Sequence, residues 1–312
     1  MDFTIYLMDM LVFVAIFALL SMSLNIEYGY TGLGNFGKVA FFMAGAYTYA
    51  IFISLGVPFY ICFIFSAIVA ALLGGLVSLP ALRLREDYLA ITTLAIGEVL
   101  RIFVKAESWL TGGVWGTTVP SVFSGLGLDV KMAALVNMLF VWGILILIFF
   151  ILKFMIETPY GRVLLSIRED DMAVQALGKN PILYKAQAFM IGSAVAGIAG
   201  ALFAQYIRFI DPYMFLPMVT FTVWVMLILG GTANHYGAVI GAFIVEIFNR
   251  GSRIAKDYLD LPFDPNNVQF VLFGILIILF LLYRPYGLFK EKPLKTGVEK
   301  EVIKWQSSSS IK

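Results

Sequence analysis

The long uncharged segments of this chain constrain its fold more than any other feature. Residues 39–82 and 212–245 contain no Asp, Glu, Lys or Arg, whereas about 20 apolar residues suffice to cross a bilayer core. Each segment is long enough for two membrane-spanning helices, with breaks expected at residues 56–58 and 230–236. A further uncharged stretch, residues 265–283, is long enough for one. Three more uncharged stretches, residues 10–26, 132–152 and 186–207, are each long enough for one helix. The sequence therefore predicts an all-α, polytopic integral membrane protein with about eight transmembrane helices, within a range of about eight to ten.

Composition supports this class and excludes several functions. Hydrophobic residues make up 61% of the 312 residues and charged residues 13%, against about half and a quarter in soluble domains. The net charge of +2 gives no electrostatic basis for binding nucleic acid. One histidine excludes any site that needs two, and one cysteine excludes an intrachain disulfide. We expect no catalytic residue, no metal site, no cofactor bound by this chain itself and no enzyme activity.

Lys and Arg residues give the predicted orientation, because positively charged loops resist translocation. Most of the 22 Lys and Arg residues fall on one side of the predicted helices, in segments that include Lys38, residues 153–185 and residues 284–312. That side is predicted to be cytoplasmic, so we expect a multi-pass protein of the cell membrane with its C-terminus in the cytoplasm. Residues 1–289 then form a transmembrane domain, and the Lys- and Ser-rich residues 290–312 form a disordered cytoplasmic tail.

Residues 32–37 form a glycine-rich segment that matches two nucleotide-binding patterns by letter. Neither match has the required context, because no strand is expected there and Val39 follows Lys38 where a phosphate loop needs Ser or Thr. Glycines within an apolar segment either let helices pack closely or unwind a helix beside a cavity. For residues 37–50 the sequence leaves both interpretations open.

Glu98 and Arg101 are ionisable residues inside an otherwise apolar stretch, residues 88–105. Their spacing places both on one helix face, and such groups in a membrane are usually paired or face water. Two roles stay open for them, a part in a translocation pathway or a structural ion pair. Polar groups in small-residue or glycine-broken spans give the candidate pathway residues, which are Asn35, Tyr47, Thr92, Thr93 and Glu98.

Three other polar features receive structural interpretations. His235 lies in the predicted break at residues 230–236 and is expected to cap the loop or to face solvent. Glu246 and Arg250 are four residues apart near a helix end, which predicts a salt bridge. Residues 111–127 are uncharged but rich in Gly, Thr and Ser, which predicts an outer loop and leaves re-entry into the membrane open.

The predicted cytoplasmic loop at residues 157–186 contains a short amphipathic segment, residues 168–178. Four apolar residues fall on one helix face: Met172, Ala173, Ala176 and Leu177. Acidic residues fill the first turn and Gly178 ends the segment. A helix this short needs something to pack against. Acids with small apolar side chains favour a protein partner over a membrane surface, which selects basic faces with large apolar anchors.

This loop and four further blocks resemble one family of membrane proteins. The loop carries Thr158-Pro159-Tyr160-Gly161-Arg162, Ile167–Asp170 and Ala176-Leu177-Gly178. The further blocks are Gly29–Leu33 with Phe36-Gly37, Leu82–Arg85 with Asp87–Ile91, Thr111-Gly112-Gly113, and Gly230-Gly231 with Gly237, before a closing Arg284–Leu288. They cover nearly the whole chain in order and are similar to the M-type permease subunits of branched-chain amino-acid ATP-binding-cassette (ABC) transporters.

The resemblance implies the architecture of an ABC importer permease that moves branched-chain or similar aliphatic amino acids into the cytoplasm. It also implies that the loop is a coupling helix that docks on an ATPase subunit, with Arg168, Glu169, Asp170, Asp171, Ala173, Ala176, Leu177 and Gly178 as its residues. The implied partners are two ABC ATPase subunits that carry ATP and Mg²⁺, a sister permease in a heterodimer, and an extracytoplasmic amino-acid-binding protein.

Other functions stay open beside this one. Lys38 stands where the family pattern usually has His, and related permeases serve urea or short amides, so the resemblance does not fix the substrate. An ion-coupled secondary transporter that uses Glu98 is a different class and would need no ATPase. An intramembrane enzyme has the least support, because the sequence offers no catalytic constellation.

Overall fold

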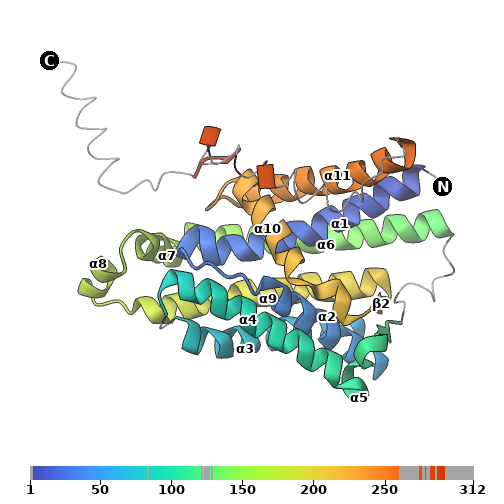
Figure 1. Cartoon of the computed structure of the whole chain (residues 1–312), viewed down its shortest axis with the longest axis horizontal. Helices are drawn as coiled ribbons and strands as arrows, with labels where there is room; N and C mark the ends of the chain where they lie inside the picture. The colour runs from blue at the N-terminus through green and yellow to red at the C-terminus, as the bar shows by residue number, and fades with distance from the viewer. Residues whose placement is uncertain are drawn as a thin grey trace.

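The computed structural model shows an almost entirely helical chain (Figure 1). It describes residues 3–82, 84–120, 122, 127, 129–259, 274–275, 278, 282–284 and 287–291. The longer helices are α1 (Phe3–Leu24), α2 (Lys38–Ser54), α3 (Phe59–Ala81), α4 (Glu86–Ala106), α6 (Val130–Glu157), α7 (Pro159–Glu169), α9 (Pro181–Ile207), α10 (Pro217–Gly230) and α11 (His235–Leu259). The shorter elements are the π-helical turn η1 (Asn25–Gly29), α5 (Ser108–Thr111), the 3-10 helices η2 (Gly113–Trp115) and η4 (Pro212–Phe215), α8 (Asp171–Ala176), and the strands β1 (Thr117–Thr118) and β2 (Phe209–Ile210).

Four of the described helices are long and apolar enough to cross a membrane: α1 together with η1, α3, α6 and α9. The helices α2 and α10 are apolar but shorter. The breaks expected at residues 56–58 and 230–236 fall where α2 gives way to α3 and where α10 gives way to α11. The all-α prediction and these two breaks are confirmed. The stretch at residues 265–283 and the tail at residues 290–312 lie almost entirely outside the described residues.

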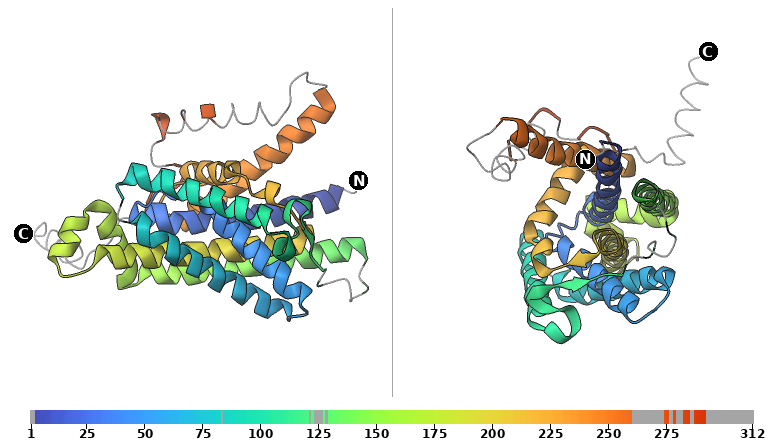
Figure 2. Two further views of the ribbon diagram at one scale, coloured as in Figure 1. Left: turned by 60° about the horizontal axis from the view of Figure 1, so that its bottom comes forward. Right: turned by 90° about the vertical axis from the view of Figure 1, so that its right-hand side faces the viewer.

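The bundle has a buried centre and an apolar outer face. In Figure 1, α11 lies on one side of α1, α2, α3 and α4 lie on the other, and α10 crosses α1. Figure 2 shows the far end of α11 pointing away from the other helices. The central helix α1 packs against α6, α9, α10 and α11. By contrast, α3 exposes every fourth side chain from Ile64 to Leu76 and buries Cys62, Ser66 and Ala70 on its other face. Such an exposed apolar stripe suits contact with lipid.

Glycine lets α2 and α9 approach to backbone contact. A Cβ atom on Gly45 would lie 2.1 Å from the carbonyl oxygen of Gly197, and one on Gly200 would lie 1.9 Å from that of Phe42. Close packing therefore explains the glycine within the helical part of residues 37–50. Unwinding applies to the segment before it, because residues 32–37 are not helical. These residues join two helices, whereas a dinucleotide-binding pattern needs a preceding strand.

We expect Gly200→Ala to lower the free energy of unfolding by about 3 kcal/mol, because the added methyl group overlaps the α2 backbone and forces the helices apart. Gly143→Ala on α6 is the matched control, since no atom lies within 4 Å of its Cβ position, and it should be neutral or stabilise by at most about 1 kcal/mol. Denaturant titration in detergent, followed by circular dichroism, measures both. Equal stability of the two variants would contradict the close packing of α2 on α9.

The described residues of the segment predicted as an outer loop form a small cap at the end of the bundle away from α8 (Figure 1). The strand β1 pairs antiparallel with β2, with Thr117 opposite Ile210 and Thr118 opposite Phe209. Gly116, at φ 71°, permits this pairing, because a Cβ atom there would lie 2.5 Å from the carbonyl oxygen of Ile210. The cap is thus held against the chain that follows α9.

Candidate functional site

The helical backbone is interrupted between η1 and α2, and this break, residues 32–37, lies inside the bundle. Residues 32–37 are not helical, yet Asn35 is fully buried. Non-helical backbone at membrane depth needs partners for its N–H and C=O groups. Neighbouring side chains supply them: the Thr93 hydroxyl of α4 accepts from the Phe36 N–H at 3.0 Å, and the Trp224 indole of α10 donates to the Asn35 carbonyl at 3.3 Å.

The break lies within the length of the surrounding helices and not at their ends. A Cβ atom on Gly37 would lie 2.2 Å from the carbonyl oxygen of Thr93, and one on Gly192 of α9 would lie 2.3 Å from a carboxylate oxygen of Glu27. Gly192 lies about 16 Å along the axis of α9 from the first residue of that helix, Pro181, because each residue adds about 1.5 Å. The glycine of α9 makes room for the Glu27 side chain at this depth.

A buried ion pair lies at this break. The Lys38 Nζ atom is 2.6 Å from Oε1 of Glu27, and the exposed fractions of the two side chains are 1% and 0%. Asn35 donates from Nδ2 to Oε2 of Glu27 at 2.9 Å. Burying two charges inside a helix bundle is costly even when they are paired, and ionisable groups inside a membrane usually mark a functional site. The pair is the strongest candidate site in the described chain.

The sequence predicts Asn35 as a site residue but neither Glu27 nor Lys38. It places Lys38 in a cytoplasmic segment, which is wrong, because Lys38 is the first residue of α2 and is fully buried. The signal that could have found the pair is the position of the two opposite charges on either side of the glycine-rich residues 32–37.

The structure brings together two of the five candidate pathway residues at the break. Asn35 binds the buried carboxylate, and Thr93 binds the backbone of the break. Thr92 is the half-buried neighbour of Thr93 on α4. Tyr47 lies further along α2 and is buried, and its hydroxyl has no hydrogen-bond partner among the described residues.

The two predicted charge pairs on single helices are both present. Glu98 accepts two hydrogen bonds from Arg101, Oε1 from Nη2 at 2.5 Å and Oε2 from Nε at 2.9 Å, which is the arrangement of the structural alternative for this pair. Glu246 binds Arg250 at 3.2 Å, as predicted, and Arg250 also pairs with Asp9 of α1 at 2.5 Å. Gly97, the neighbour of Glu98, packs against Gly37 of the break, but among the described residues the Glu98 carboxylate binds Arg101 and not the Glu27 cluster.

His235, at the break between α10 and α11, is buried and does not face solvent. Only 5% of the residue is exposed, and its Nδ1 atom is 3.3 Å from Nδ2 of Asn25 in η1. Oδ1 of Asn25 accepts from the Ala233 N–H at 2.8 Å, and Oδ1 of Asn234 accepts from the Tyr236 N–H at 3.0 Å. The solvent-facing alternative for His235 is therefore wrong, because asparagine side chains cap the segment and the histidine packs inward. The break after α10 and the end of η1 are in contact.

The predicted coupling loop contains two helices where one was expected. Oδ1 of Asp170 caps α8 by accepting from the N–H groups of Met172 at 2.8 Å and Ala173 at 3.1 Å. A single helix over residues 168–178 is therefore wrong at its start, because a residue that caps a new helix leaves the helical conformation of the preceding one. Gly178, at φ 77°, follows the end of α8 and stops it as predicted.

The predicted apolar face of α8 is exposed. The exposed fraction is 73% for Met172 and 80% for Leu177, and Ala173 and Ala176 are exposed beside them. The other face is held by Val174, which is buried among apolar side chains of α7. A short helix is thus fixed on the bundle with its apolar face uncovered.

Arg168 points from the end of α7 to the break. Its Nη1 atom donates to the Gly29 carbonyl at 2.5 Å, and its Nη2 atom binds Glu291 at 2.7 Å and Glu169 at 3.2 Å. Partial burial acts to lower the pKa of Arg168, but the carboxylates of Glu291 and Glu169 outweigh this effect and raise the pKa above its ordinary value. A charged side chain of the predicted coupling loop therefore binds the last residue of η1 directly.

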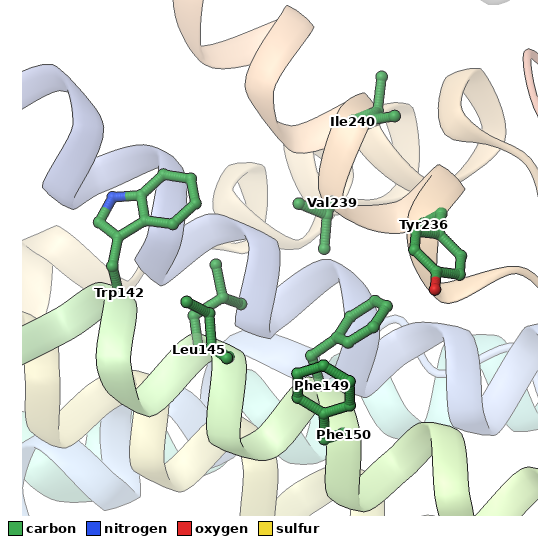
Figure 3. Close-up of a pocket in the computed structure, with 8 residues that line it drawn as sticks. Trp142, Leu145, Phe149, Phe150, Tyr236, Val239 and Ile240 are labelled. Atoms are coloured by element: carbon green, nitrogen blue, oxygen red, sulfur yellow. The ribbon is translucent and has the colours of Figure 1, made fainter.

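A groove elsewhere on the bundle has a different character. It lies between α6 and α11, has a volume of about 170 Å³ and is lined by Trp142, Leu145, Ile146, Phe149, Phe150, Tyr236, Val239 and Ile240 (Figure 3). Tyr236 supplies the hydroxyl, which accepts from Lys153 at 3.3 Å. This lining suits an apolar group, so the break with its ion pair remains the candidate for a site that handles polar molecules.

The chain matches, over residues 6–281, the protein family described as "Branched-chain amino acid transport system / permease component". The chain belongs to this family. The family match and the apolar helices indicate a multi-pass membrane protein. The resemblance found in the sequence motifs is confirmed.

Proteins similar to this permease carry two names. The probable branched-chain amino acid transport permease protein LivM of Methanocaldococcus jannaschii is 29% identical over 94% of this chain and 96% of its own length. The high-affinity LivM of Escherichia coli K12 is 30% identical over 94% of this chain and 73% of its own length. The high-affinity LivH of Salmonella typhimurium is 26% identical over 87% of this chain and 90% of its own length. No solved structure matches the chain.

Proposed function

We propose that this permease is the transmembrane subunit of an ABC importer that moves branched-chain or similar aliphatic amino acids into the cytoplasm, driven by separate ATPase subunits. The observation that carries the proposal is the family match over residues 6–281, supported by relatives named as branched-chain amino acid transport permeases. ATP and Mg²⁺ belong to the ATPase subunits in this proposal, and this chain provides the path through the membrane.

The exposed face of α8 supports docking on an ATPase subunit. The helix stands at one end of the bundle (Figure 1), where Val174 and an ion pair between Asp171 and Lys185 hold it in place. Met172 and Leu177 remain uncovered in the single chain, and covering them in a groove of the partner gains about 25 cal/mol per Å² of apolar surface. In this proposal the α8 end is cytoplasmic and residues 157–186 form the coupling loop.

Arg168 supports a short path from the coupling loop to the buried ion pair. ATP binding and hydrolysis would bias the permease between outward-open and inward-open states. A displacement of α8 by the ATPase acts on Gly29 through the Arg168 hydrogen bond, and Gly29 lies two residues after Glu27 in the same helical turn. The break is therefore within mechanical reach of the docking surface.

Two further partners complete the proposed importer. Relatives named LivM and LivH are both permease proteins of branched-chain amino acid transport systems, which supports a sister permease and a heterodimer. An extracytoplasmic amino-acid-binding protein would deliver the substrate at the cap opposite α8, where Trp109 and Trp115 are 80% and 89% exposed.

Two alternatives to this proposal remain, one with a different substrate and one with a different energy source. An importer for urea or short amides would share the architecture and differ in substrate. A secondary transporter would need Glu98 to bind a coupling ion, whereas both oxygens of Glu98 already accept hydrogen bonds from Arg101. The occupied carboxylate disfavours this second alternative.

We expect Leu177→Arg to reduce binding of the ATPase subunit by about 30-fold or more, as for a buried apolar residue at the centre of an interface. The isolated permease should keep its stability to within about 0.5 kcal/mol, because Leu177 is exposed in the single chain. Gln175→Arg is the control, since Gln175 is exposed outside the apolar face of α8. Quantitative co-purification measures the effect, and equal recovery of ATPase with both variants would contradict docking on this face.

Purification of the tagged chain in detergent from its native host tests the proposal as a whole. The expected result is that ATPase subunits and a sister permease co-purify in fixed proportion to the chain. Recovery of the folded chain alone at high yield would contradict the importer and favour a secondary transporter.

A further inference from the structure

Glu27 and Lys38 each stand at the helix end that disfavours their charge. Glu27 lies in the last turn of the continuous helix Phe3–Gly29, where the helix dipole places partial negative charge. Lys38 is the first residue of α2, where the helix dipole places partial positive charge. Exchanging the two residues would give the same ion pair with both helix dipoles in its favour. The observed arrangement is therefore not the one that stability alone would select.

The arrangement concentrates one sign of charge on each side of the break. The Glu27 carboxylate and the carbonyl end of η1 form a negative half, and Lys38 with the N-terminus of α2 forms a positive half. In broken transmembrane helices, such ends bind the charged groups of a substrate. An α-amino acid carries an ammonium group and a carboxylate on one carbon atom, so it presents one charge to each half. Urea and amides carry neither charge.

Both ions have hydrogen-bonding capacity that the described part of the chain does not use. Lys38 has three N–H donors and donates one hydrogen bond, to Oε1 of Glu27. The carboxylate accepts from Lys38 and from Asn35, although two carboxylate oxygens can accept about four hydrogen bonds. Since both side chains are shielded from solvent, a further partner reaches them only when the break moves.

Aromatic side chains lie beside the same break. Phe36 stacks on Trp224 with the ring centroids 4.7 Å apart, and Tyr28 meets Trp224 edge-on at 4.6 Å. These rings provide an apolar surface for an aliphatic side chain next to the ion pair. Because Glu27 precedes and Lys38 follows the non-helical residues, a movement in that segment alone can separate the two ions.

We infer that Glu27 and Lys38 are the specificity-determining pair of this permease for zwitterionic amino acids. The two side chains neutralise each other while the path is closed. When the break opens, Glu27 takes the ammonium group of the substrate and Lys38 takes its carboxylate, and the ion pair re-forms behind the substrate. The inference rests on the proposed function as an amino-acid importer, and it assigns the discrimination against urea and amides to these two residues.

The test uses the permease purified with its accompanying subunits and without any substrate-binding protein. The probes are L-leucine, isocaproate, which is leucine without its ammonium group, and isoamylamine, which is leucine without its carboxylate. The measured quantity is the ligand concentration that raises the melting temperature of the complex by a fixed amount. For the wild type we expect L-leucine to act at a concentration about tenfold lower than either analogue.

Charge-neutral variants separate the two halves of the pair. Glu27→Gln should make L-leucine and isocaproate equivalent, because no carboxylate remains for the ammonium group, and Lys38→Met should do the same for L-leucine and isoamylamine. The double variant Glu27→Gln/Lys38→Met leaves no unpaired buried charge, so it folds even where a single variant does not. It should lose the preference for L-leucine over both analogues. A double variant that keeps the wild-type preference would overturn the inference and show a purely structural ion pair.

Two outcomes separate this inference from the proposed function. Selective stabilisation by L-leucine of a chain that co-purifies with no ATPase would support the inference and contradict the importer. ATP-driven uptake of urea, with no response of the complex to L-leucine, would overturn the inference and leave an ATP-driven importer standing.

Discussion

Lys38→Met is expected to lower the free energy of unfolding by about 3–5 kcal/mol, because it leaves the Glu27 carboxylate buried without its counter-ion. The other described hydrogen bond to this carboxylate comes from the neutral amide of Asn35 at 2.9 Å. Water does not compensate, since the Glu27 side chain is 0% exposed. Unfolding in mixed detergent micelles with increasing dodecyl sulfate, followed by tryptophan fluorescence, measures the change.

The matched control removes both charges. Glu27→Gln/Lys38→Met should return the stability to within about 1 kcal/mol of the wild type, because a neutral pair of similar volume replaces the ion pair without leaving an unpaired charge. Lys179→Met, at an exposed position of the loop after α8, should change stability by at most about 0.5 kcal/mol. If Lys38→Met proves as stable as Lys179→Met, the ion pair is not buried in the folded protein.

Arg168→Gln is expected to lower amino-acid uptake by roughly 10- to 100-fold while ATP hydrolysis by the complex continues, a loss typical of a broken coupling between two sites. The guanidinium group joins three parts of the chain: the coupling loop, the Gly29 carbonyl at 2.5 Å and Glu291 at 2.7 Å. Glutamine cannot bridge them, because its side chain is shorter and carries no charge. Uptake and phosphate release, measured on the same proteoliposomes, give the ratio of transport to hydrolysis.

Arg162→Gln is the control for this experiment. Arg162 lies on α7, as Arg168 does, but its side chain is exposed, so the variant should keep the wild-type ratio of transport to hydrolysis. The docking face of α8 is unchanged in both variants, and both should retain the ATPase subunit on purification. A wild-type ratio for Arg168→Gln would mean that the contact with Gly29 does not transmit the movement of α8.

Features that follow from local chemistry were predictable from the sequence. The uncharged residues 39–82 and 212–245 divide into helices at residues 56–58 and 230–236, because glycine and proline there interrupt the helical backbone. The i, i+4 spacing of Glu246 and Arg250 gives their salt bridge directly. These predictions need only neighbours along one helix, and the structure confirms them.

The buried ion pair depends on contacts between distant segments, which the sequence pattern does not contain. Glu27 directly follows an uncharged stretch and Lys38 follows a run of glycines, so both patterns indicate the ends of membrane-spanning helices. Their burial comes from Gly192 of α9, which makes room for the carboxylate, and from Trp224 of α10, which binds the break. The solvent-facing prediction for His235 fails for the same reason, because its partner Asn25 lies at the end of a different helix.

The boundary between α7 and α8 shows a different limit. Acidic residues favour the first turn of a helix, but Asp is also a preferred capping residue. The sequence of acids around Asp170 fits both patterns, and only the hydrogen bonds to Met172 and Ala173 decide that Asp170 is the cap. The exposed apolar face over Met172 and Leu177 is nevertheless the face that the helical spacing predicts.

Uptake of L-leucine into proteoliposomes tests the central claim most directly. The vesicles contain the permease with its co-purified subunits and a substrate-binding protein from the same host, with and without ATP on the α8 side. The importer predicts uptake that requires ATP and is unchanged by ionophores that dissipate proton and sodium gradients. Uptake that proceeds without ATP and stops when the ionophores are added would contradict an ATP-driven importer.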